Sequence, residues 1–467
     1  MSHRTGLCAA AVLAAVGVTM TPLGVQTATA AETAPSRFTA VEAEPGPEPG
    51  EVRFTWQQDG TDTDAYVIET GLTSFSTTNP RLPEHARGST VFTAPAEARS
   101  LTLSAAQTAA AGAPVGSANH LYYRVHAVNH TAGGEVTTYW PRLQTVAVQP
   151  ATAAETGTGL RAGSFNVRTA RATTDARSWL ERVPDVARTI VDHQLGVVAL
   201  QELGPGRADG QLGTTQGTPR QTDSLLTELA SAGGGQYRLV RSTPYVKAGT
   251  PSATQGMRIL YDASRYQLVS DCPDTAPDGT YSPSCSVVLP VRDSDDTEAD
   301  RLRAAYAEFA DRGTGARFFL VSVHLDHRHS TDLATEQTLD ALRGAQAQAA
   351  ADAVAAVNPD NVPVVLGGDL NSWQNNKVGY SAHDALVADG FYDTAAAQTQ
   401  INTRYTTYNA FAETIPEPVS GFGARLDGLL VKGVVGARTF ENVMDKVDAT
   451  RASDHNLIVA DILLPTG

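Results

Sequence analysis

The sequence has little cysteine, little lysine and only one long apolar run. Of 467 residues, three are cysteine and four are lysine, and 50 acidic side chains against 35 basic ones give a net charge of −15. Such a chain lacks the positive surplus on which non-specific nucleic-acid binding depends, which argues against a chromatin or ribosomal protein. The charge does not argue against an enzyme that recruits cations to a phosphate site. The length favours two domains.

The single long apolar run lies near the N-terminus. His3 and Arg4 precede it, it extends from residue 7 to residue 20, and Ala28-Thr29-Ala30 follows. The run is shorter than the roughly 20 residues that cross a bilayer. A basic start, an apolar middle and an A-x-A end are typical of a secretory signal peptide. We therefore expect residues 1–31 to be removed and the mature chain to be secreted, without a transmembrane segment.

Two cysteines follow this segment, Cys272 and Cys285, in a stretch rich in proline, serine, glycine and aspartate. In an oxidising compartment an isolated pair of this kind favours a loop-closing disulfide. Such a loop contributes about 3 kcal/mol to stability through the unfolded state. Two ligands of a metal site are the alternative. Neither interpretation makes these cysteines catalytic.

Residues 36–149 predict an all-β domain. Alternating segments such as 65–69 and 121–128 are separated by turn signals, and Gly133-Gly134 suits a hairpin turn. The segment resembles a fibronectin type III domain, because Trp56 matches the buried tryptophan of that family and YYRVHAVN matches its tyrosine-bearing strand. Core packing is the simplest role for these aromatic residues. A surface or carbohydrate partner for the domain is the alternative.

Residues 150–159 are small and polar without periodicity, and they predict a linker. Strand-like and helix-like segments alternate over residues 160–467. Apolar residues at helical spacing indicate helices over 176–194 and 335–357, and 197–200 is a buried strand run. This order favours an α/β fold, a four-layer sandwich of two packed mixed β-sheets flanked by helices.

Polar residues of the types that act on phosphate or metal end these strand segments. Such residues at a sheet edge are placed where binding sites gather. Taken singly, each has a structural explanation: a turn, a solvated strand exit, a hydrogen-bonded core histidine or a helix cap. In chain order they are Asn166, Glu202, His324, Asp369, Asn371, Asp427, Asp454 and His455.

Their order and spacing resemble the endonuclease/exonuclease/phosphatase superfamily, which includes deoxyribonuclease I. The motifs SFNVR, LQE, HLD, GGDLNS, RLDGLLV and SDHN follow the order of that family over nearly all of residues 160–467. The combination of GDLN and SDH at this separation is highly specific. The resemblance implies a metal-dependent phosphoric ester hydrolase.

Phosphodiester hydrolysis explains why these residue types occur together. The anion repels hydroxide and its leaving oxygen needs neutralisation, and Mg²⁺, which prefers carboxylate and amide oxygens, answers both needs. Mn²⁺ and Ca²⁺ are the alternative ions. The resemblance implies the metal ligands Asn166, Glu202 and Asp454. It implies the catalytic residues His324, Asp369, Asn371, Asp427 and His455.

The resemblance also assigns roles to the catalytic residues. Asp369 would accept the proton of the attacking water or orient it, and Asn371 would hold the nucleophile and a phosphate oxygen. His455 and His324 would donate to the phosphate from opposite sides. Asp427 would hold His455 in its donating tautomer and raise its pKa, as a carboxylate partner does.

The rim of the site decides the substrate class, and here the sequence departs from its nuclease relatives. Where they commonly carry a basic residue two positions after the metal-binding glutamate, this chain has Gly204, and Arg207 is the nearest replacement. Trp373 and Tyr408 are placed to flank a substrate base or sugar, with packing as the alternative. No acidic residue precedes the RILY segment to pair with His324, so Asp326 is the candidate partner.

The sequence thus predicts a secreted metal-dependent phosphoesterase that cleaves phosphodiesters by in-line attack of an activated water. An extracellular nuclease is the first choice. The alternative is a sphingomyelinase-like enzyme for phospholipid head groups, or one for small phosphorylated molecules. A non-catalytic adhesion protein is the least favoured interpretation. We expect the chain to be a monomer.

Overall fold

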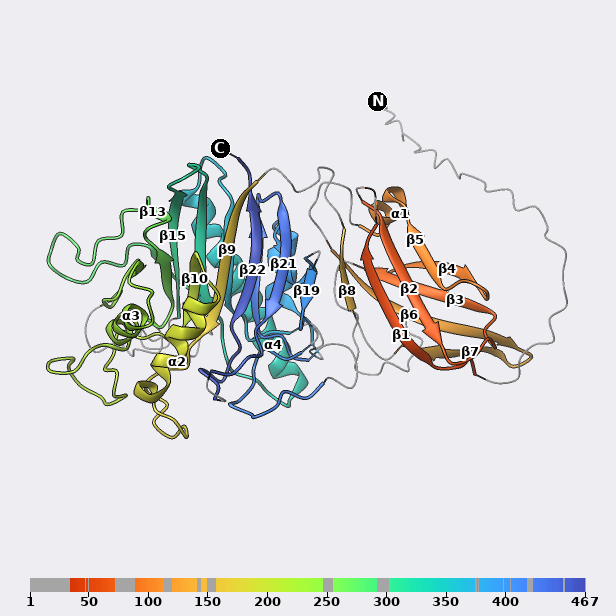
Figure 1. The fold of residues 1–467 in the computed structure, drawn as a ribbon, viewed down its shortest axis with the longest axis horizontal. Helices are drawn as coiled ribbons and strands as arrows, with labels where there is room; N and C mark the ends of the chain where they lie inside the picture. Colours follow the sequence, from red (N-terminus) through yellow and green to blue (C-terminus); the bar gives the residue numbers. More distant parts are fainter. Residues whose placement is uncertain are drawn as a thin grey trace, which may run out of the picture.

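A computed structural model of the chain shows an all-β N-terminal domain followed by a larger α/β domain (Figure 1). The expected signal peptide, residues 1–31, and residues 150–156 of the expected linker lie outside the described residues. Among the described residues, no helix is both long and apolar enough to cross a membrane. The structure describes residues 34–46, 48, 50–71, 89–112, 120–140, 144–148, 157–246, 255–291, 302–373, 376, 378–397, 399–403, 405–417, 423–447 and 450–466.

The described residues of the N-terminal domain form two β-sheets and one short helix. The first sheet has the order β1 (Phe38–Pro45), β2 (Val52–Gln58), β5 (Ser100–Leu103). The second has the order β4 (Thr90–Pro95), β3 (Ala65–Gly71), β6 (His120–Thr131), β7 (Gly134–Tyr139), and β8 (Gln144–Ala147) also pairs with β6. Helix α1 (Ala105–Ala110), which the sequence did not lead us to expect, begins at the Ser104 capping box.

Alternation places one face of each of these strands in a shared core. Trp56, Tyr66 and Tyr123 are all buried in it, as expected. Gly134, whose φ of 117° favours glycine, lies at the β6–β7 hairpin that Gly133-Gly134 predicted. The all-β architecture is therefore confirmed, while membership of the fibronectin type III family stays a prediction.

The C-terminal domain is built on two mixed β-sheets. The first has the order β11 (Tyr237–Leu239), β12 (Arg258–Asp262), β10 (Val197–Gln201), β9 (Thr158–Asn166), β22 (Ile458–Leu464), β21 (Gly436–Asn442), β19 (Thr399–Ile401). The second has the order β13 (Tyr266–Leu268), β15 (Arg303–Asp311), β16 (Arg317–His324), β17 (Val364–Asp369), β20 (Asp427–Lys432), β18 (Tyr392–Asp393), and β14 (Ser286–Val288) also pairs with β15. β9 begins at Thr158, two residues before the expected start of this domain.

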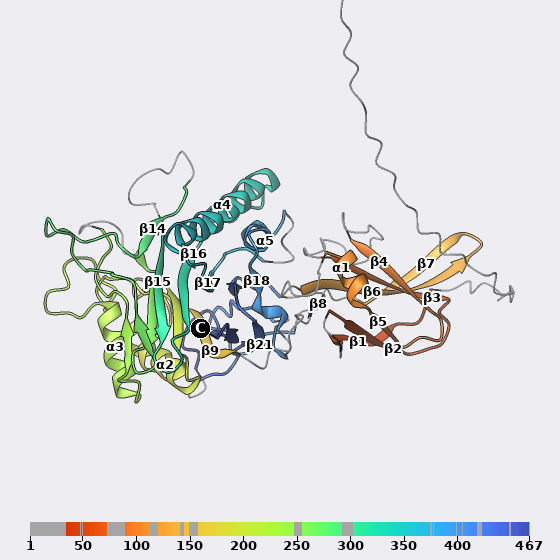
Figure 2. The same cartoon turned by 90° about the horizontal axis from the view of Figure 1, so that it is seen from above.

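Helices cover the outer faces of both sheets (Figure 2). α2 (Trp179–Asp192) and α3 (Gln221–Ser231) share a core with the first sheet. α4 (Leu333–Val357) and α5 (Ser381–Ala388) share one with the second. A third apolar core lies between the sheets and includes Leu160 and Ile259 from one and Phe318 and Val365 from the other. The four-layer α/β sandwich is thus confirmed.

Cys272 and Cys285 form a disulfide, with their Cα atoms 5.6 Å apart. The bond closes the segment that connects β13 to β14. Sulfur atoms joined in this way are not metal ligands, so the loop-closing interpretation of the two cysteines holds.

Candidate active site

Three of the expected residues lie side by side on neighbouring strands of the second sheet. In the parallel pair β16–β17, His324 is opposite Asp369. In the antiparallel pair β17–β20, Asp369 is opposite Asp427. Because β20 runs against β17, its first residue lies at the same sheet edge as the last residue of β17. The register alone therefore brings a histidine and two aspartates together.

The first sheet contributes Asn166 and Glu202 in the same way. Asn166 is the last residue of β9 and lies opposite Gln201 of the parallel strand β10, and Glu202 follows directly. The backbone of Glu202 has a φ of 58°, which turns the chain sharply at the strand end. Gly256 passes over this turn, and a Cβ atom there would lie 3.0 Å from the Glu202 Cα. Glycine at position 256 permits that close approach.

The amide of Asn166 joins the contributions of the two sheets. Its Nδ2 donates to Oε1 of Glu202 at 3.2 Å and to Oδ2 of Asp369 at 3.0 Å. Its Oδ1 accepts from the backbone N–H of Arg168 at 3.1 Å, which fixes the orientation of the amide. Asn166 is fully buried, so this buried side chain holds two carboxylates that lie on different sheets.

Two imidazoles flank the carboxylate of Asp369. The Nε2 atoms of His324 and His455 each lie 3.6 Å from Asp369 Oδ2. On its other side, His455 Nδ1 lies 2.8 Å from Asp427 Oδ2. Burial alone would lower the pKa of His455, but the carboxylates of Asp427 and Asp369 outweigh it and raise that pKa to about 10. The two carboxylates therefore favour the imidazolium form of His455, which donates through Nε2.

A second group of acidic side chains lies beside Asn166. Burial raises the pKa of Asp454, and the carboxylate of Glu202 raises it further against the opposing effects of His455 and Arg168. The Arg168 Nη1 lies 3.3 Å from Asp454 Oδ2, but Arg168 is shared with Asp175. The two carboxylates thus repel each other, and Arg168, which pairs with Asp454, is shared with Asp175.

The donor set beside Asn166 fits a hard divalent cation. The carboxylates of Glu202 and Asp454 are the oxygen ligands that Mg²⁺ prefers, and the effect of Glu202 on the pKa of Asp454 shows a charge that a cation would relieve. Glu202 is partly exposed, whereas Asn166 and Asp454 are buried. The two carboxylates are therefore candidate ligands, and the Nδ2 group of Asn166 orients Glu202, while Asn166 as a ligand stays a prediction.

Asp369, Asp427 and His455 also come close enough to hold an ion, since one ligand atom from each lies within 4.8 Å of the others. In that group, however, both ring nitrogens of His455 face carboxylates. A metal ion in this group would have to replace the proton of the imidazole, because only the neutral ring can serve as a ligand.

Three further expected residues are Asn371, Tyr408 and Trp373, and each makes a defined contact in the structure. Asn371, whose φ of 48° makes a turn after β17, donates from Nδ2 to the backbone oxygen of Leu325 at 3.1 Å. The ring of Tyr408 stands edge-on to His455 at 5.0 Å and is 43% exposed. Trp373 packs against the ring of His329 at 5.1 Å.

The structure gives two residues expected near the rim, Arg207 and Asp326, other partners than the site residues. Arg207 forms a two-pronged ion pair with Asp209, which includes a 2.9 Å bond from its Nε, and within the described part of the chain it bonds to none of the site residues. Asp326, the expected partner of His324, binds Arg328 instead, with 2.9 Å between Arg328 Nε and Asp326 Oδ1. The carboxylate that faces His324 is Asp369.

Sequence reasoning did not assign the residues that support His455 and Asp427. Thr407 Oγ1 accepts hydrogen bonds from the backbone N–H groups of Leu426 and Asp427 at 3.0 and 3.1 Å. Asn409 Nδ2 donates to Asn456 Oδ1 at 2.8 Å, and Asn456 directly follows His455. These amide and hydroxyl contacts join segments that are distant in sequence, so no local spacing reveals them.

Arg168 is a further residue at the site that the sequence reasoning left without a role. It is part of the SFNVR motif, and its φ of 59° turns its side chain toward Asp175 and Asp454. A guanidinium here lies next to the expected metal ligands and is about one-third exposed. Its position two residues after Asn166 is the sequence feature that could have identified Arg168 as a residue at the site.

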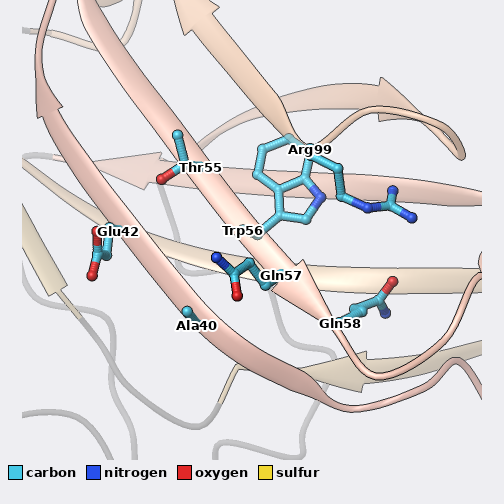
Figure 3. A pocket seen from close by; sticks show the side chains of 7 residues that line it. All are labelled: Ala40, Glu42, Thr55, Trp56, Gln57, Gln58 and Arg99. Atoms are coloured by element: carbon cyan, nitrogen blue, oxygen red, sulfur yellow. The ribbon is translucent and has the colours of Figure 1, made fainter.

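A separate pocket of about 480 Å³ lies on the N-terminal domain (Figure 3). Arg99, which lines it, also donates to the Tyr66 hydroxyl at 2.9 Å. A carbohydrate or surface partner for this domain stays a prediction. The pocket is lined by Ala40, Glu42, Thr55, Trp56, Gln57, Gln58 and Arg99 and includes none of the expected site residues.

The fold and the site together define a hydrolase for phosphoester bonds. Residues 163–455 match the model of the Endonuclease/Exonuclease/phosphatase family. The match covers more than half of the chain and every site residue from Asn166 to His455, and the chain belongs to this family. Members of the family are divalent-metal-dependent hydrolases of phosphoester bonds.

Solved structures with a similar fold have low sequence identity to this chain. An endonuclease/exonuclease/phosphatase family protein from Bacteroides thetaiotaomicron is 17% identical, with a TM-score of 0.45 over 67% of this chain and 100% of that one. A protein of the same description from Bacteroides vulgatus is 20% identical, with a TM-score of 0.46 over 66% and 99%. The human Nocturnin catalytic domain with bound sulfate is 16% identical, with a TM-score of 0.42 over 66% and 96%. None of the curated proteins compared matches the chain.

Proposed function

We propose that this protein is a secreted phosphodiesterase that depends on a divalent cation, with Mg²⁺ as first choice, and hydrolyses nucleic acid outside the cell. The observation that carries the proposal is the position of Asp369 between the imidazoles of His324 and His455. A carboxylate beside a buried imidazolium combines a proton acceptor and a proton donor within a few ångströms.

The side chains divide the work of hydrolysis between them. Asp369 accepts the proton of the attacking water, and His455 donates a hydrogen bond from Nε2 to a phosphate oxygen. Asp427 keeps His455 protonated at Nδ1, so Nε2 stays directed toward the substrate side. His324 donates to the phosphate from the other side of Asp369. Asn166 holds Asp369 in place.

Glu202 and Asp454 would hold the divalent cation, which when bound supplies neutralisation of the phosphate charge and a lower pKa for the attacking water. Asn166 and the backbone N–H of Thr169, which donates to Glu202 Oε2 at 2.8 Å, orient the carboxylate of Glu202. Such support from neighbouring hydrogen bonds is typical of ligating carboxylates.

Two residues at the rim support a nucleic-acid substrate. Tyr408 presents a partly exposed ring beside His455, and an aromatic ring of this kind stacks on a base of any identity. Arg168 offers a guanidinium suited to a second phosphate of the strand. A lipid substrate has less support, because Tyr408 is the one candidate site residue among the exposed large apolar side chains of the described residues.

Two features support secretion. The disulfide between Cys272 and Cys285 suits an oxidising compartment. The N-terminal sequence has the pattern of a signal peptide.

A substrate panel tests the proposal. Purified protein is incubated with plasmid DNA, RNA, sphingomyelin vesicles and bis(p-nitrophenyl) phosphate, each with Mg²⁺ and with a chelator. The His455→Ala variant serves as the control for a contaminating nuclease. We expect cleavage of DNA or RNA and of the small diester, loss of both with chelator, and no cleavage by the variant. Cleavage of sphingomyelin with intact nucleic acid would replace the nuclease assignment by the lipid one.

A further inference from the structure

The two domains meet at a buried aromatic side chain. Tyr122 belongs to β6 of the N-terminal domain, on the face opposite to the core residues Leu121 and Tyr123. It is nevertheless fully buried, and its ring lies 6.2 Å from that of His383 on α5 of the catalytic domain. Figure 1 shows β8, which pairs with β6, at the end of the N-terminal domain that faces the catalytic domain.

The surface that Tyr122 covers is a cluster of polar and charged side chains. His383 stacks on Tyr380 at 4.4 Å with nearly parallel rings, and its Nε2 lies 3.3 Å from Asp393 Oδ2. Arg425 donates to the same Asp393 oxygen at 2.5 Å. These four residues are all at most 4% exposed. Buried charges of this kind depend on their partners and on the exclusion of water.

Electrostatic interactions cross the interface. Burial raises the pKa of Tyr122 well above its usual range, with Tyr380 raising it further and Arg425 lowering it. Burial would lower the pKa of His383, but its bonds to Asp384 and Asp393 outweigh this and raise it. The hydroxyl of Tyr122 therefore lies within the field of the cluster.

The cluster leads directly into the catalytic residues. Arg425 stands two positions before Asp427, the partner of His455. The intervening residue, Leu426, accepts a bond from the backbone N–H of Leu370 at 2.7 Å, next to Asp369. The side chain of Arg425 thus fixes one end of a short segment whose other end carries the carboxylate that orients His455.

We propose that docking of the N-terminal domain through Tyr122 positions the segment 425–427, so that this domain is a working part of the catalytic unit and Tyr122 and Arg425 are positioning residues. Without the cover of Tyr122, water reaches the Arg425–Asp393 pair and weakens their attraction. The start of β20 then gains freedom, and the Asp427–His455 hydrogen bond loses its fixed geometry.

The test uses the full-length chain and has two readouts. The first, enzyme kinetics, rests on the proposed function, and the second, hydrogen exchange, does not. Tyr122→Ala removes the ring and Tyr122→Asp places a negative charge beside Asp393, while Tyr122→Phe keeps the ring. Tyr139→Ala is the matched control, because the ring of Tyr139 contacts His126 and Arg124 of its own domain. Thermal unfolding establishes that each variant is folded.

The first readout is kcat and KM for bis(p-nitrophenyl) phosphate. We expect Tyr122→Ala and Tyr122→Asp to lower kcat about tenfold with little change in KM, since small displacements of catalytic groups cost rate rather than binding. Tyr122→Phe and Tyr139→Ala should keep the wild-type kcat. Arg425→Lys, altered on the catalytic side of the interface, should reproduce the loss if the Tyr122 variants do not fold.

The second readout is amide hydrogen exchange of residues 424–428, which needs no activity. We expect faster exchange there in Tyr122→Asp and unchanged exchange in Tyr139→Ala. Wild-type kcat together with wild-type exchange in Tyr122→Asp would overturn the proposal. A wild-type protein inactive on every phosphoester would overturn the proposed function instead, and the exchange readout would still decide whether docking orders the segment.

Discussion

The Nδ1 atom of His455 lies 2.8 Å from Oδ2 of Asp427, and both side chains are buried at the edge where the two sheets meet. The carboxylate fixes the proton on Nδ1 and directs Nε2 toward Asp369, 3.6 Å away. The pair behaves as a carboxylate–imidazole unit in which the carboxylate orients the base and stabilises its charge.

Replacing Asp427 by asparagine should therefore abolish most of the activity while the fold persists. The amide leaves the shape of the site intact but no longer stabilises the imidazolium or its tautomer, so we expect kcat to fall on the order of 100-fold or more. Steady-state kinetics on a small diester measures the loss. Asp209→Asn, which alters a carboxylate paired with Arg207 outside the site, is the control. A kcat within threefold of wild type would contradict the role of Asp427.

Replacing Glu202 by glutamine should change the dependence on the metal ion. The amide keeps one oxygen but loses the charge that attracts the cation, so the Mg²⁺ concentration for half-maximal activity should rise at least about tenfold. A Mg²⁺ titration of activity and a calorimetric titration of binding both report this shift. Asp209→Asn should titrate like wild type. An unchanged Mg²⁺ requirement would place the ion elsewhere, with Asp369, Asp427 and His455 as the next candidates.

Tyr408→Ala should separate nucleic acid from small substrates. Loss of one stacking ring removes about 1–3 kcal/mol of binding per base, so KM for single-stranded DNA should rise about 10- to 100-fold while KM for bis(p-nitrophenyl) phosphate stays near wild type. Tyr408→Phe keeps the ring and should behave like wild type. If the alanine variant raises KM equally for both substrates, the ring of Tyr408 positions His455 and does not bind the nucleic acid.

The raised pKa of His455 predicts how stability depends on pH in the metal-free protein. Its folded pKa of about 10 exceeds the usual value of 6.5. The stabilisation from the charged imidazole is therefore fully present below about pH 6.5 and is lost as the pH rises toward 10. Denaturant unfolding with chelator should show that wild type loses more stability than His455→Asn over this interval. Parallel pH curves for the two proteins would mean that His455 is not protonated in the fold.

Several residues that the sequence predicted for the site come together in the structure, and the limits of that prediction have physical causes. Asp369, Asp427 and Glu202 were recognisable because each belongs to a short motif next to an apolar strand. The role of Asn166 as a bridge between Glu202 and Asp369 could not be recognised in the sequence, because it depends on the distance between the two sheets. The position of the Arg207 side chain could not be predicted from the sequence. It depends on the side-chain rotamer, and the observed rotamer pairs the guanidinium with Asp209.

The interface between the domains shows the same limit. On β6, Tyr122 faces away from the core of its own domain, on a sheet face that is commonly solvated in an antiparallel sheet. Its burial against His383 is a consequence of docking, which no periodicity in the sequence encodes. The partner of His324 likewise depends on which strands pair. We expected Asp326, but the pairing of β16 with β17 places Asp369 next to His324.

The most direct test of the account compares wild type with Asp369→Asn in the hydrolysis of bis(p-nitrophenyl) phosphate, each with Mg²⁺, with chelator, and with Mg²⁺ restored. We predict that wild-type turnover stops with chelator and returns with Mg²⁺, and that the variant stays inactive throughout although it unfolds cooperatively. Turnover that ignores the chelator, or that survives in Asp369→Asn, would contradict it.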